Sequence, residues 1–314
     1  MPTIEQIAKE SGVSPATVSR ALRNAHNVSP TTRNLVLQTA AQLGRSLPSE
    51  LQGKRVLAIG STNVPQFFAA LDDAAQQHHT TLLWKYAKSD NYMADDLFSM
   101  EEYDGIILID GVMDPQALQL LREQIPVVQC RTYSGLNSDI AVLVDDFQMG
   151  FDIAEHMIQR GCQRIMYINV PSYFASRPFA RDRLRGMMAA CCEAGTQLAR
   201  VCNSNRLHEY PDLIHQAIAD GADGIILGMV PQEVYQVFQE LRDHIPQDLA
   251  LAAFDDSEVC EVLGITAMRQ PIDAIASTAM HLLHNLMEHQ AEFSTPLYVR
   301  TKHELIVRSS TAVK

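Results

Sequence analysis

Hydrophobic positions follow two different periods along the chain. In the first 45 residues they recur every three or four positions, as on amphipathic helices. Beyond residue 55, short apolar runs such as VLAIG (56–60), GIILID (105–110) and LALAAF (249–254) alternate with longer helical patterns. Alternating strands and helices predict parallel sheets covered by helices on both faces. We therefore expect an α/β fold that follows a small helical N-terminal segment.

Three helix starts are readable in the N-terminal segment. Thr3 and Gln6 have the spacing of a capping box. Ser14-Pro15 and Ser29-Pro30 each combine an N-cap serine with proline at the first helical position. Gly12 lies where the first two helices need a tight turn. These signals predict three helices within residues 1–46.

The apolar side chains of these helices can form a miniature core. They are Ile4, Ile7, Ala8, Val13, Val18, Leu22, Val28, Leu35 and Val36. This packing leaves Pro15, Ala16, Thr17, Ser19 and Arg20 at or near the exposed face of the second helix. Two short helices joined through glycine, with a third behind them, favour a helix-turn-helix unit that reads the DNA major groove. The alternative is an ordinary three-helix subdomain.

Charge is divided unevenly between the two regions. Residues 1–55 carry seven Lys or Arg and three Asp or Glu, whereas residues 56–314 carry 18 and 34. The net charge of −12 therefore belongs to the body, and the N-terminal segment is basic. This asymmetry is typical of a protein in which only the small segment meets DNA phosphates.

The N-terminal string from residue 4 to 36 is specific. It reads IEQIAKESGVSPATVSRALRNAHNVSPTTRNLV and closely resembles the headpiece of the LacI/GalR family of transcriptional regulators. The resemblance implies a homodimer that binds a pseudo-palindromic double-stranded DNA operator. The DNA contacts it implies, together with those expected from the exposed face, are Thr3, Ser14, Pro15, Ala16, Thr17, Ser19, Arg20, Asn27, Val28 and Thr32.

A hinge or linker is expected over residues 47–55. Leu51-Gln52-Gly53-Lys54 matches the end of the family's hinge helix, whose leucine wedges into the minor groove. The family's Tyr-x-Pro-Asn element is absent, and the segment is about three residues shorter than usual. Leu51 is therefore either a DNA wedge or a plain linker residue.

The body, residues 56–314, resembles the family's sensor domain. The matching motifs include Arg183-Leu184-Arg185-Gly186, Ala253-Phe254-Asp255-Asp256 and the closing ELIVRSST (304–311). The resemblance implies a periplasmic-binding-protein-like domain of two Rossmann-like subdomains. We expect the first to span about 56–153 and 271–296, and the second about 154–270 and 297–314. An internal echo between residues 103–121 and 222–238 also indicates two similar halves.

Four side chains are candidates for holding a small-molecule effector. The resemblance places Arg183 and Asp255 across the cleft from each other, where a guanidinium donates and a carboxylate accepts hydrogen bonds. Phe67 could stack on a ligand, and Arg131 follows the strand VVQC at the edge of the cleft. The alternatives are structural salt bridges for the charged residues and core packing for Phe67.

The effector is expected to be a sugar or a sugar derivative. The family's polar Asn at this cleft falls on Val230, and the loop before Arg183 adds Arg177 and Arg181. Three guanidiniums near one cleft favour an anionic effector, such as a sugar phosphate or sugar acid. The alternative is that Arg177 and Arg181 only balance surface carboxylates such as Asp182.

Other functional classes have little support. Motifs for a P-loop, a G-x-S-x-G nucleophile or an H-E-x-x-H metal site are missing, so we expect no enzymatic activity, no cofactor and no metal. The N-terminus has no secretory signal and no apolar run could span a membrane, which favours the cytoplasm. The rivals are a periplasmic-type binding protein and an enzyme with a helix-turn-helix appendage.

Overall fold

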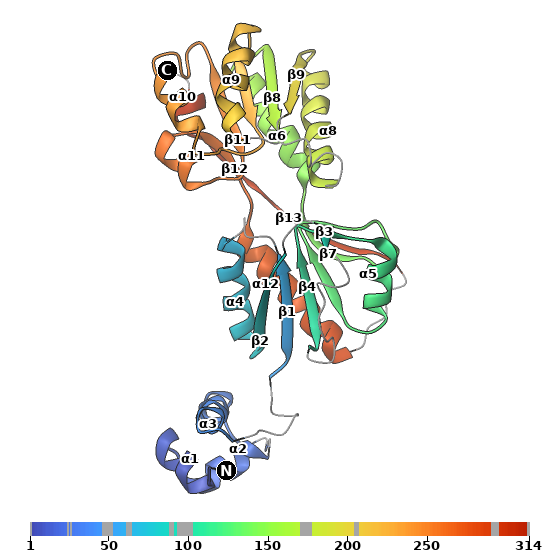
Figure 1. Ribbon diagram of the computed structural model, residues 1–314, viewed down its shortest axis with the longest axis vertical. Helices are drawn as coiled ribbons and strands as arrows, with labels where there is room; N and C mark the ends of the chain where they lie inside the picture. Colours follow the sequence, from blue (N-terminus) through green and yellow to red (C-terminus); the bar gives the residue numbers. More distant parts are fainter. Residues whose placement is uncertain are drawn as a thin grey trace. The chain divides into compact units, whose positions relative to one another are not determined.

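The computed structural model describes residues 2–23, 25, 27–45, 53–60, 65–87, 91–92, 103–169, 178–203, 207–289 and 295–312. The chain divides into two compact units. One is residues 1–55 with 79–81, and the other is residues 56–78 with 82–314 (Figure 1).

The N-terminal unit contains the three predicted helices. They are α1 (Ile4–Ser11), α2 (Pro15–Leu22) and α3 (Pro30–Gln42). The Thr3 hydroxyl accepts the backbone N–H of Gln6, and the Gln6 side chain accepts the backbone N–H of Thr3, which completes the capping box. The Ser14 and Ser29 hydroxyls cap the other two helices by accepting the backbone N–H groups of Thr17 and Thr32. Gly12 ends α1 with a φ of 68°, a left-handed conformation that glycine adopts without strain.

A small hydrophobic core holds these helices together. Its buried members are Ile7, Ala8, Val18, Ala21, Val28, Val36 and Ala40. Ile4, Val13 and Leu22 pack against it while remaining partly exposed. The expectation that Leu35 joins this core is wrong, because its side chain is 44% exposed. Val36 and Ala40 take the inward face of α3, and Leu35 lies about 100° away from Val36 around the helix.

The second unit is built on two sheets of six strands each. The first has the order β13-β7-β6-β4-β1-β2 and the second has the order β14-β12-β11-β10-β8-β9. The strands of the first are β1 (Arg55–Gly60), β2 (Thr81–Tyr86), β4 (Gly105–Ile109), β6 (Val127–Cys130), β7 (Ile140–Val144) and β13 (Leu297–Thr301). Those of the second are β8 (Arg164–Asn169), β9 (Gln197–Asn203), β10 (Gly224–Leu227), β11 (Ala250–Phe254), β12 (Thr266–Arg269) and β14 (Glu304–Ile306). A separate pair joins β3 (Asn91–Tyr92) to β5 (Val112–Met113). Apart from antiparallel β14, the registers described in the second sheet are parallel, which confirms the α/β class.

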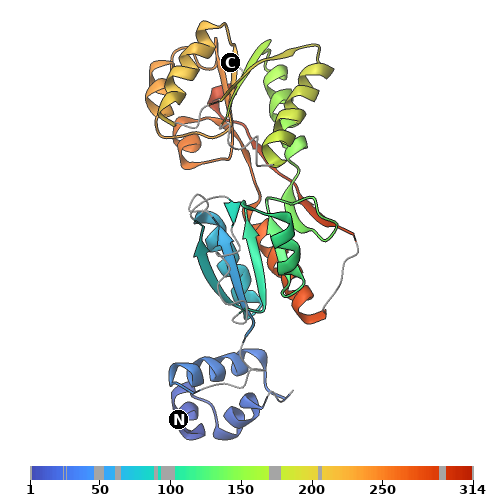
Figure 2. The same cartoon turned by 45° about the vertical axis from the view of Figure 1, so that its right-hand side comes forward.

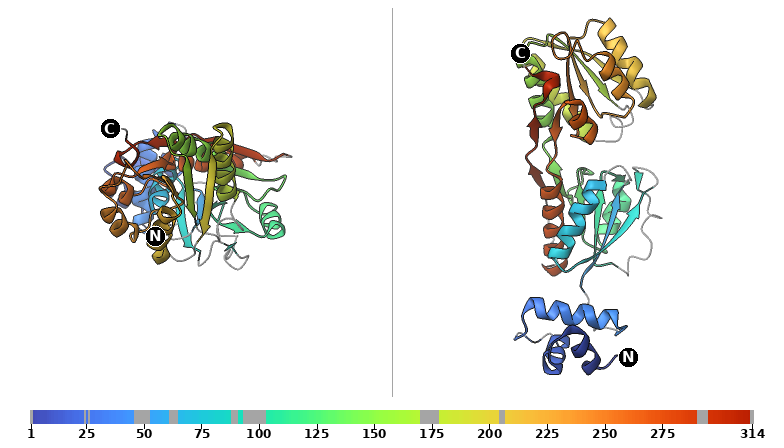
Figure 3. Two further views of the ribbon diagram at one scale, coloured as in Figure 1. Left: turned by 90° about the horizontal axis from the view of Figure 1, so that it is seen from above. Right: turned by 90° about the vertical axis from the view of Figure 1, so that its left-hand side faces the viewer.

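Helices cover both faces of each sheet. On the first sheet, α4 (Pro65–Gln77) and α12 (Ile272–His289) lie side by side on one face and α5 (Pro115–Arg122) on the other (Figure 3). On the second, α6 (Asp146–Gln159) and α8 (Pro178–Glu193) face α9 (Tyr210–Ala219), α10 (Val234–Glu240) and α11 (Glu258–Leu263) across the sheet (Figure 2). None of the helices in the described part of the chain is long and apolar enough to span a bilayer.

Strand residues alternate between the two helical layers. In β4, Ile107 belongs to the core beneath α4 and α12, whereas Ile106 and Leu108 belong to the core beneath α5. In β10, Ile226 faces the α6–α8 layer, while its neighbours Ile225 and Leu227 face the opposite helices. Because both faces are covered, these strands are apolar throughout, as parallel strands in α/β proteins are.

The chain passes between the two halves of this unit three times, at β7–α6, β12–α12 and β13–β14. The first passage precedes Asp146, earlier than the expected division at 153, because all of α6 packs on α8 and the second sheet. The third passage follows Thr301, whereas the expected division lay at residue 296. The reason is that β13 pairs with β7 in the first sheet from Leu297 onward. Both corrections concern segments whose packing partners are distant in sequence.

Two glycines allow an unusually close approach of α6 and α8. A Cβ atom on Gly186 would lie 1.9 Å from the carbonyl oxygen of Phe147, and one on Gly150 would lie 2.0 Å from that of Arg183. Backbone therefore packs on backbone at this crossing. The approach also brings the start of α8 beside the start of α6.

We expect Gly186→Ala to destabilise the protein by about 1–3 kcal/mol or more, because the new methyl overlaps a backbone carbonyl that cannot rotate away. Urea unfolding followed by circular dichroism measures the change. Met188→Ala is the matched control on the same helix, because Met188 is exposed, and should stay within about 0.5 kcal/mol. Equal stability of Gly186→Ala and the wild type would contradict the tight crossing.

Candidate functional sites

The exposed face of α2 is the candidate DNA-reading surface. Pro15, Ala16 and Arg20 are exposed, and Thr17 and Ser19 are half-buried. The Nε atom of Arg20 donates to the carbonyl oxygen of Ala16 at 3.1 Å, which keeps the guanidinium along the helix. The structure thus brings the five residues predicted from the α2 pattern onto one short helix.

The remaining predicted DNA contacts fall into different environments. Ser14 and Thr17 bond to each other through their hydroxyls at 2.8 Å, and Thr3 and Asn27 are exposed. Thr32 is half-buried beside its N-cap Ser29. Val28 is 8% exposed and packs in the headpiece core, and its DNA contact stays a prediction. Leu51 lies outside the described residues, and its minor-groove role stays a prediction.

An open pocket of about 790 Å³ lies where β6, β11 and β12 end. Both halves of the second unit contribute to it, as expected where parallel strands present their carboxyl ends. It is lined by Gln66, Arg131, Asp255, Asp256, Ser257, Glu258, Glu261, Arg269, Gln270, Pro271, Ile272, Asp273 and Ala274.

Arg183 is buried next to this pocket between charges and rings. Its Nε donates to Asp146 Oδ1 at 2.9 Å, and its Nη2 lies 3.8 Å from Asp255 Oδ1. Its Cζ lies 5.0 Å from the ring centre of Phe179 and 4.7 Å from that of Phe254. Burial alone would lower the pKa of the guanidinium, but the two carboxylates outweigh this and raise it. Arg183 is therefore a fixed cation.

Burial has the opposite effect on the partner carboxylate. It raises the pKa of Asp146 above its ordinary value, and Arg183 and Arg131 offset only part of that rise. Asp146 begins α6 and Arg183 lies in the second turn of α8, so the close helix crossing positions this pair. Sequence reasoning identified Arg183 but missed Asp146, whose place after the strand AVLV was the available signal.

Asp255 points into the pocket from the end of β11. Its side chain is 47% exposed, and it accepts a hydrogen bond from the Gln270 side chain. Its φ of 63° is a left-handed conformation that costs energy for most residues and that aspartate tolerates. Such conformations cluster at ligand sites. The structure thus brings Asp255 and Arg183 together, as predicted.

Arg131 shares this backbone feature. It follows β6 with a φ of 62°, and its Nε lies 2.9 Å from Oδ1 of Asp110, which follows β4 with a φ of 60°. Both side chains are largely buried, and Arg131 lines the pocket. Asp110 was not among the residues predicted from sequence. Its position at the carboxyl end of the strand GIILI would have identified it.

Phe67 and Arg181 are not among the described residues that line the pocket. Phe67 is fully buried in the hydrophobic core, so its ring offers no face for stacking in this conformation, while the adjacent Gln66 lines the pocket. Arg181 is exposed and is not a lining residue. Arg177 lies outside the described residues. Arg183, which contributes to the expectation of an anionic effector, lies beside the pocket, and the charge of the effector stays a prediction.

The groups at the pocket are suited to recognition. Guanidiniums donate and carboxylates accept hydrogen bonds, which together match a polyhydroxylated ligand. The thiol of Cys130, beside Arg131, stays protonated because burial and then Asp110 raise its pKa. Within the described segments, no group of three or more His, Cys, Asp or Glu side chains is placed to hold a metal ion.

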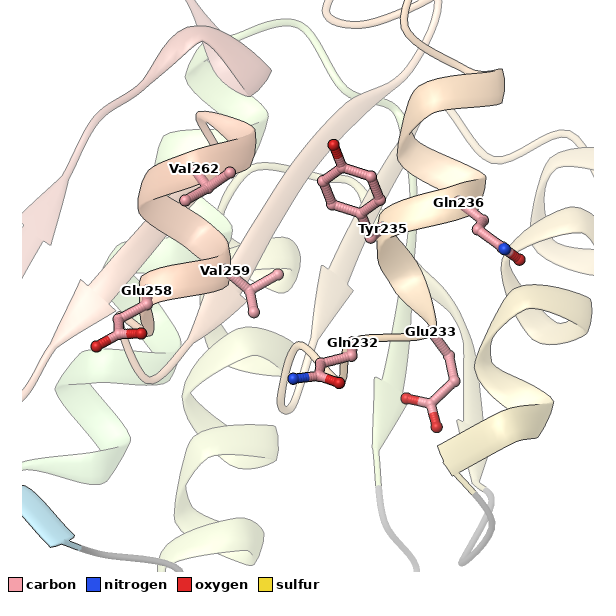
Figure 4. Close-up of a pocket in the computed structure, with 7 residues that line it drawn as sticks. All are labelled: Gln232, Glu233, Tyr235, Gln236, Glu258, Val259 and Val262. Atoms are coloured by element: carbon pink, nitrogen blue, oxygen red, sulfur yellow. The ribbon is translucent and has the colours of Figure 1, made fainter.

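A second pocket lies between α10 and α11. Figure 4 shows Tyr235 on α10 and Val259 and Val262 on α11 pointing into this space, while Gln236 points away. Val262 is 75% exposed and Tyr235 is 47% exposed. Its lining mixes apolar and polar side chains and includes none of the residues predicted from sequence, so the pocket at the strand ends is the stronger candidate for the effector site.

Comparison with known proteins covers nearly the whole chain. The family of "Bacterial regulatory proteins, lacI family" matches residues 3–44. "Periplasmic binding proteins and sugar binding domain of LacI family" matches residues 65–210, and "Periplasmic binding protein-like domain" matches residues 154–311, half of the chain.

Individual relatives are similar along their full length. Catabolite control protein A of Priestia megaterium is 26% identical over 98% of this chain and 99% of its own. The structure of the transcriptional regulator CelR with cellobiose has a TM-score of 0.67 at 22% identity, covering 99% and 100%. The lac repressor dimer bound to operator and the anti-inducer ONPF has a TM-score of 0.72 at 18% identity, covering 99% of both chains.

The helix-turn-helix unit, the two mainly parallel sheets and the three family matches agree with one another. The chain belongs to the LacI family of bacterial regulatory proteins.

Proposed function

We propose that the protein is a sequence-specific transcriptional repressor whose affinity for its operator is controlled by a sugar or a sugar derivative. One observation carries this proposal. The same chain holds a helix-turn-helix unit with an exposed α2 face and, in its other unit, a pocket with guanidinium and carboxylate groups from both halves. The cellobiose held by the similar regulator CelR supports the sugar class.

The pocket supplies a physical route to regulation. A ligand that contacts Arg131 on the first half and Asp255 on the second stabilises the arrangement in which both can be reached. Any difference in operator affinity between such arrangements becomes a coupling free energy between ligand and DNA. The three passages of the chain between the halves give that rearrangement a defined pivot.

A homodimer in the cytoplasm, acting on a pseudo-palindromic operator, completes the proposal. One headpiece covers a single half-site, and two-fold symmetry of the protein is mirrored in the DNA. Selection of bound sequences from a random DNA library tests this. Recovered sites should contain inverted repeats about one helical turn apart, and single half-sites alone would contradict the dimer.

Arg20→Ala should weaken operator binding by about 1–3 kcal/mol and relax the sequence preference, because Arg20 is exposed on the face that enters the groove. Fluorescence anisotropy with the selected operator and with random DNA measures both effects. Lys9→Ala, an exposed cation of α1, is the control for net charge. An equal loss on both DNAs would identify Arg20 as a phosphate contact.

Asp255→Asn should weaken the effector about tenfold or more, because one charged acceptor is lost, while operator affinity stays within about twofold, since α2 is untouched. Asn also tolerates the left-handed backbone, so folding is preserved. The measurement is release of labelled operator during titration with the effector. A normal response would remove Asp255 from the site.

A further inference from the structure

The pair formed by Asp110 and Arg131 changes what the pocket can bind. Arg131 lines the pocket, and its Nε lies 2.9 Å from a carboxylate that is itself almost completely buried. Both residues hold left-handed backbone at the ends of neighbouring parallel strands β4 and β6. One of the two guanidiniums that line the pocket therefore has a fixed counter-charge within the protein.

The other guanidiniums of the site are matched in the same way. Arg183 has Asp146 at 2.9 Å, and Arg269 has Asp256 at 2.7 Å. Asp256 also pairs with Arg308 at 2.7 Å, and these partners hold its pKa below the ordinary value although burial raises it. An anionic ligand would have to compete with a bound carboxylate at each of these cations.

Carboxylates outnumber guanidiniums along the described lining of the pocket. Five acidic side chains and two basic ones are present. Three of the acidic residues, Glu258, Glu261 and Asp273, lie in the first turns of α11 and α12, where they offset the positive helix N-termini. Asp255 remains, with a side chain that is 47% exposed in the pocket. Its carboxylate accepts hydrogen bonds from hydroxyl groups and repels an anion.

We infer that Asp110 is a specificity-determining residue that makes the pocket select an uncharged polyhydroxylated ligand over its phosphorylated or acidic form. This inference rests on the proposed function. A guanidinium has five N–H donors, so one bond to Asp110 leaves donors for ligand hydroxyls. With the Asp110 carboxylate paired to it at 2.9 Å, Arg131 donates these bonds without adding net positive charge to the site.

The test compares full-length wild type with Asp110→Asn. Asn nearly preserves shape and accepts a φ of 60°, so the change removes one charge and leaves the backbone intact. Asp243→Asn is the matched control, because Asp243 is exposed and does not line the pocket. The probes are inorganic phosphate at constant ionic strength and the pairs glucose with glucose 6-phosphate and ribose with ribose 5-phosphate.

The expected result has two parts. Phosphate should raise the Tm of Asp110→Asn by more than it raises the Tm of wild type or of Asp243→Asn. Adding Arg131→Ala to Asp110→Asn should abolish this extra increase. By calorimetry, wild type should bind a neutral sugar more tightly than the phosphate ester of that sugar. Asp110→Asn should reduce the ratio of these two affinities about tenfold, since one nearby negative charge is gone.

Two outcomes would overturn the inference. One is Arg131-dependent binding of phosphate or of a sugar phosphate to wild type that is as strong as in Asp110→Asn. The other is no gain of phosphate binding in Asp110→Asn. Neither outcome affects the proposed function, which fails separately if no sugar of any charge changes operator affinity. The phosphate arm tests Asp110 even when neither sugar pair contains the effector.

Discussion

The close crossing of α6 and α8 is the constraint on which the proposed effector pocket depends. Gly150 and Gly186 let two helix backbones touch, and the same approach sets Arg183 against Asp146. Without it, a buried guanidinium and a buried carboxylate would each lose the partner that offsets its desolvation. Packing and electrostatics thus share one origin, and the glycine of the Arg183–Gly186 motif serves the site from one helical turn away.

Charge at the pocket is organised in pairs. Each of Arg131, Arg183 and Arg269 meets a carboxylate on a different element, so these ion pairs hold neighbouring elements together around the pocket. Three left-handed residues, Asp110, Arg131 and Asp255, sit at ends of β4, β6 and β11. Their backbone strain is therefore concentrated at and beside the pocket.

Local signals in the sequence were sufficient for the local structure. The caps at Thr3, Ser14 and Ser29 and the alternation of strands and helices predicted the headpiece and the α/β class. Arg183 and Asp255 were found through motifs. The choice between stacking and core packing for Phe67 stayed open, and Asp110 was missed, because both depend on which distant segments become neighbours and no local pattern encodes that. The shifted passage after Thr301 has the same cause.

The order of strands in the two sheets bears on biosynthesis. Both sheets receive an edge strand, β13 or β14, from residues 297–306, and the first half also needs α12. On the ribosome neither half can be completed until almost the whole chain has emerged, whereas the headpiece is made first and depends only on local contacts. A nascent chain therefore carries a finished basic helix-turn-helix well before it carries a sensor, and nonsense truncations near the end damage both halves at once.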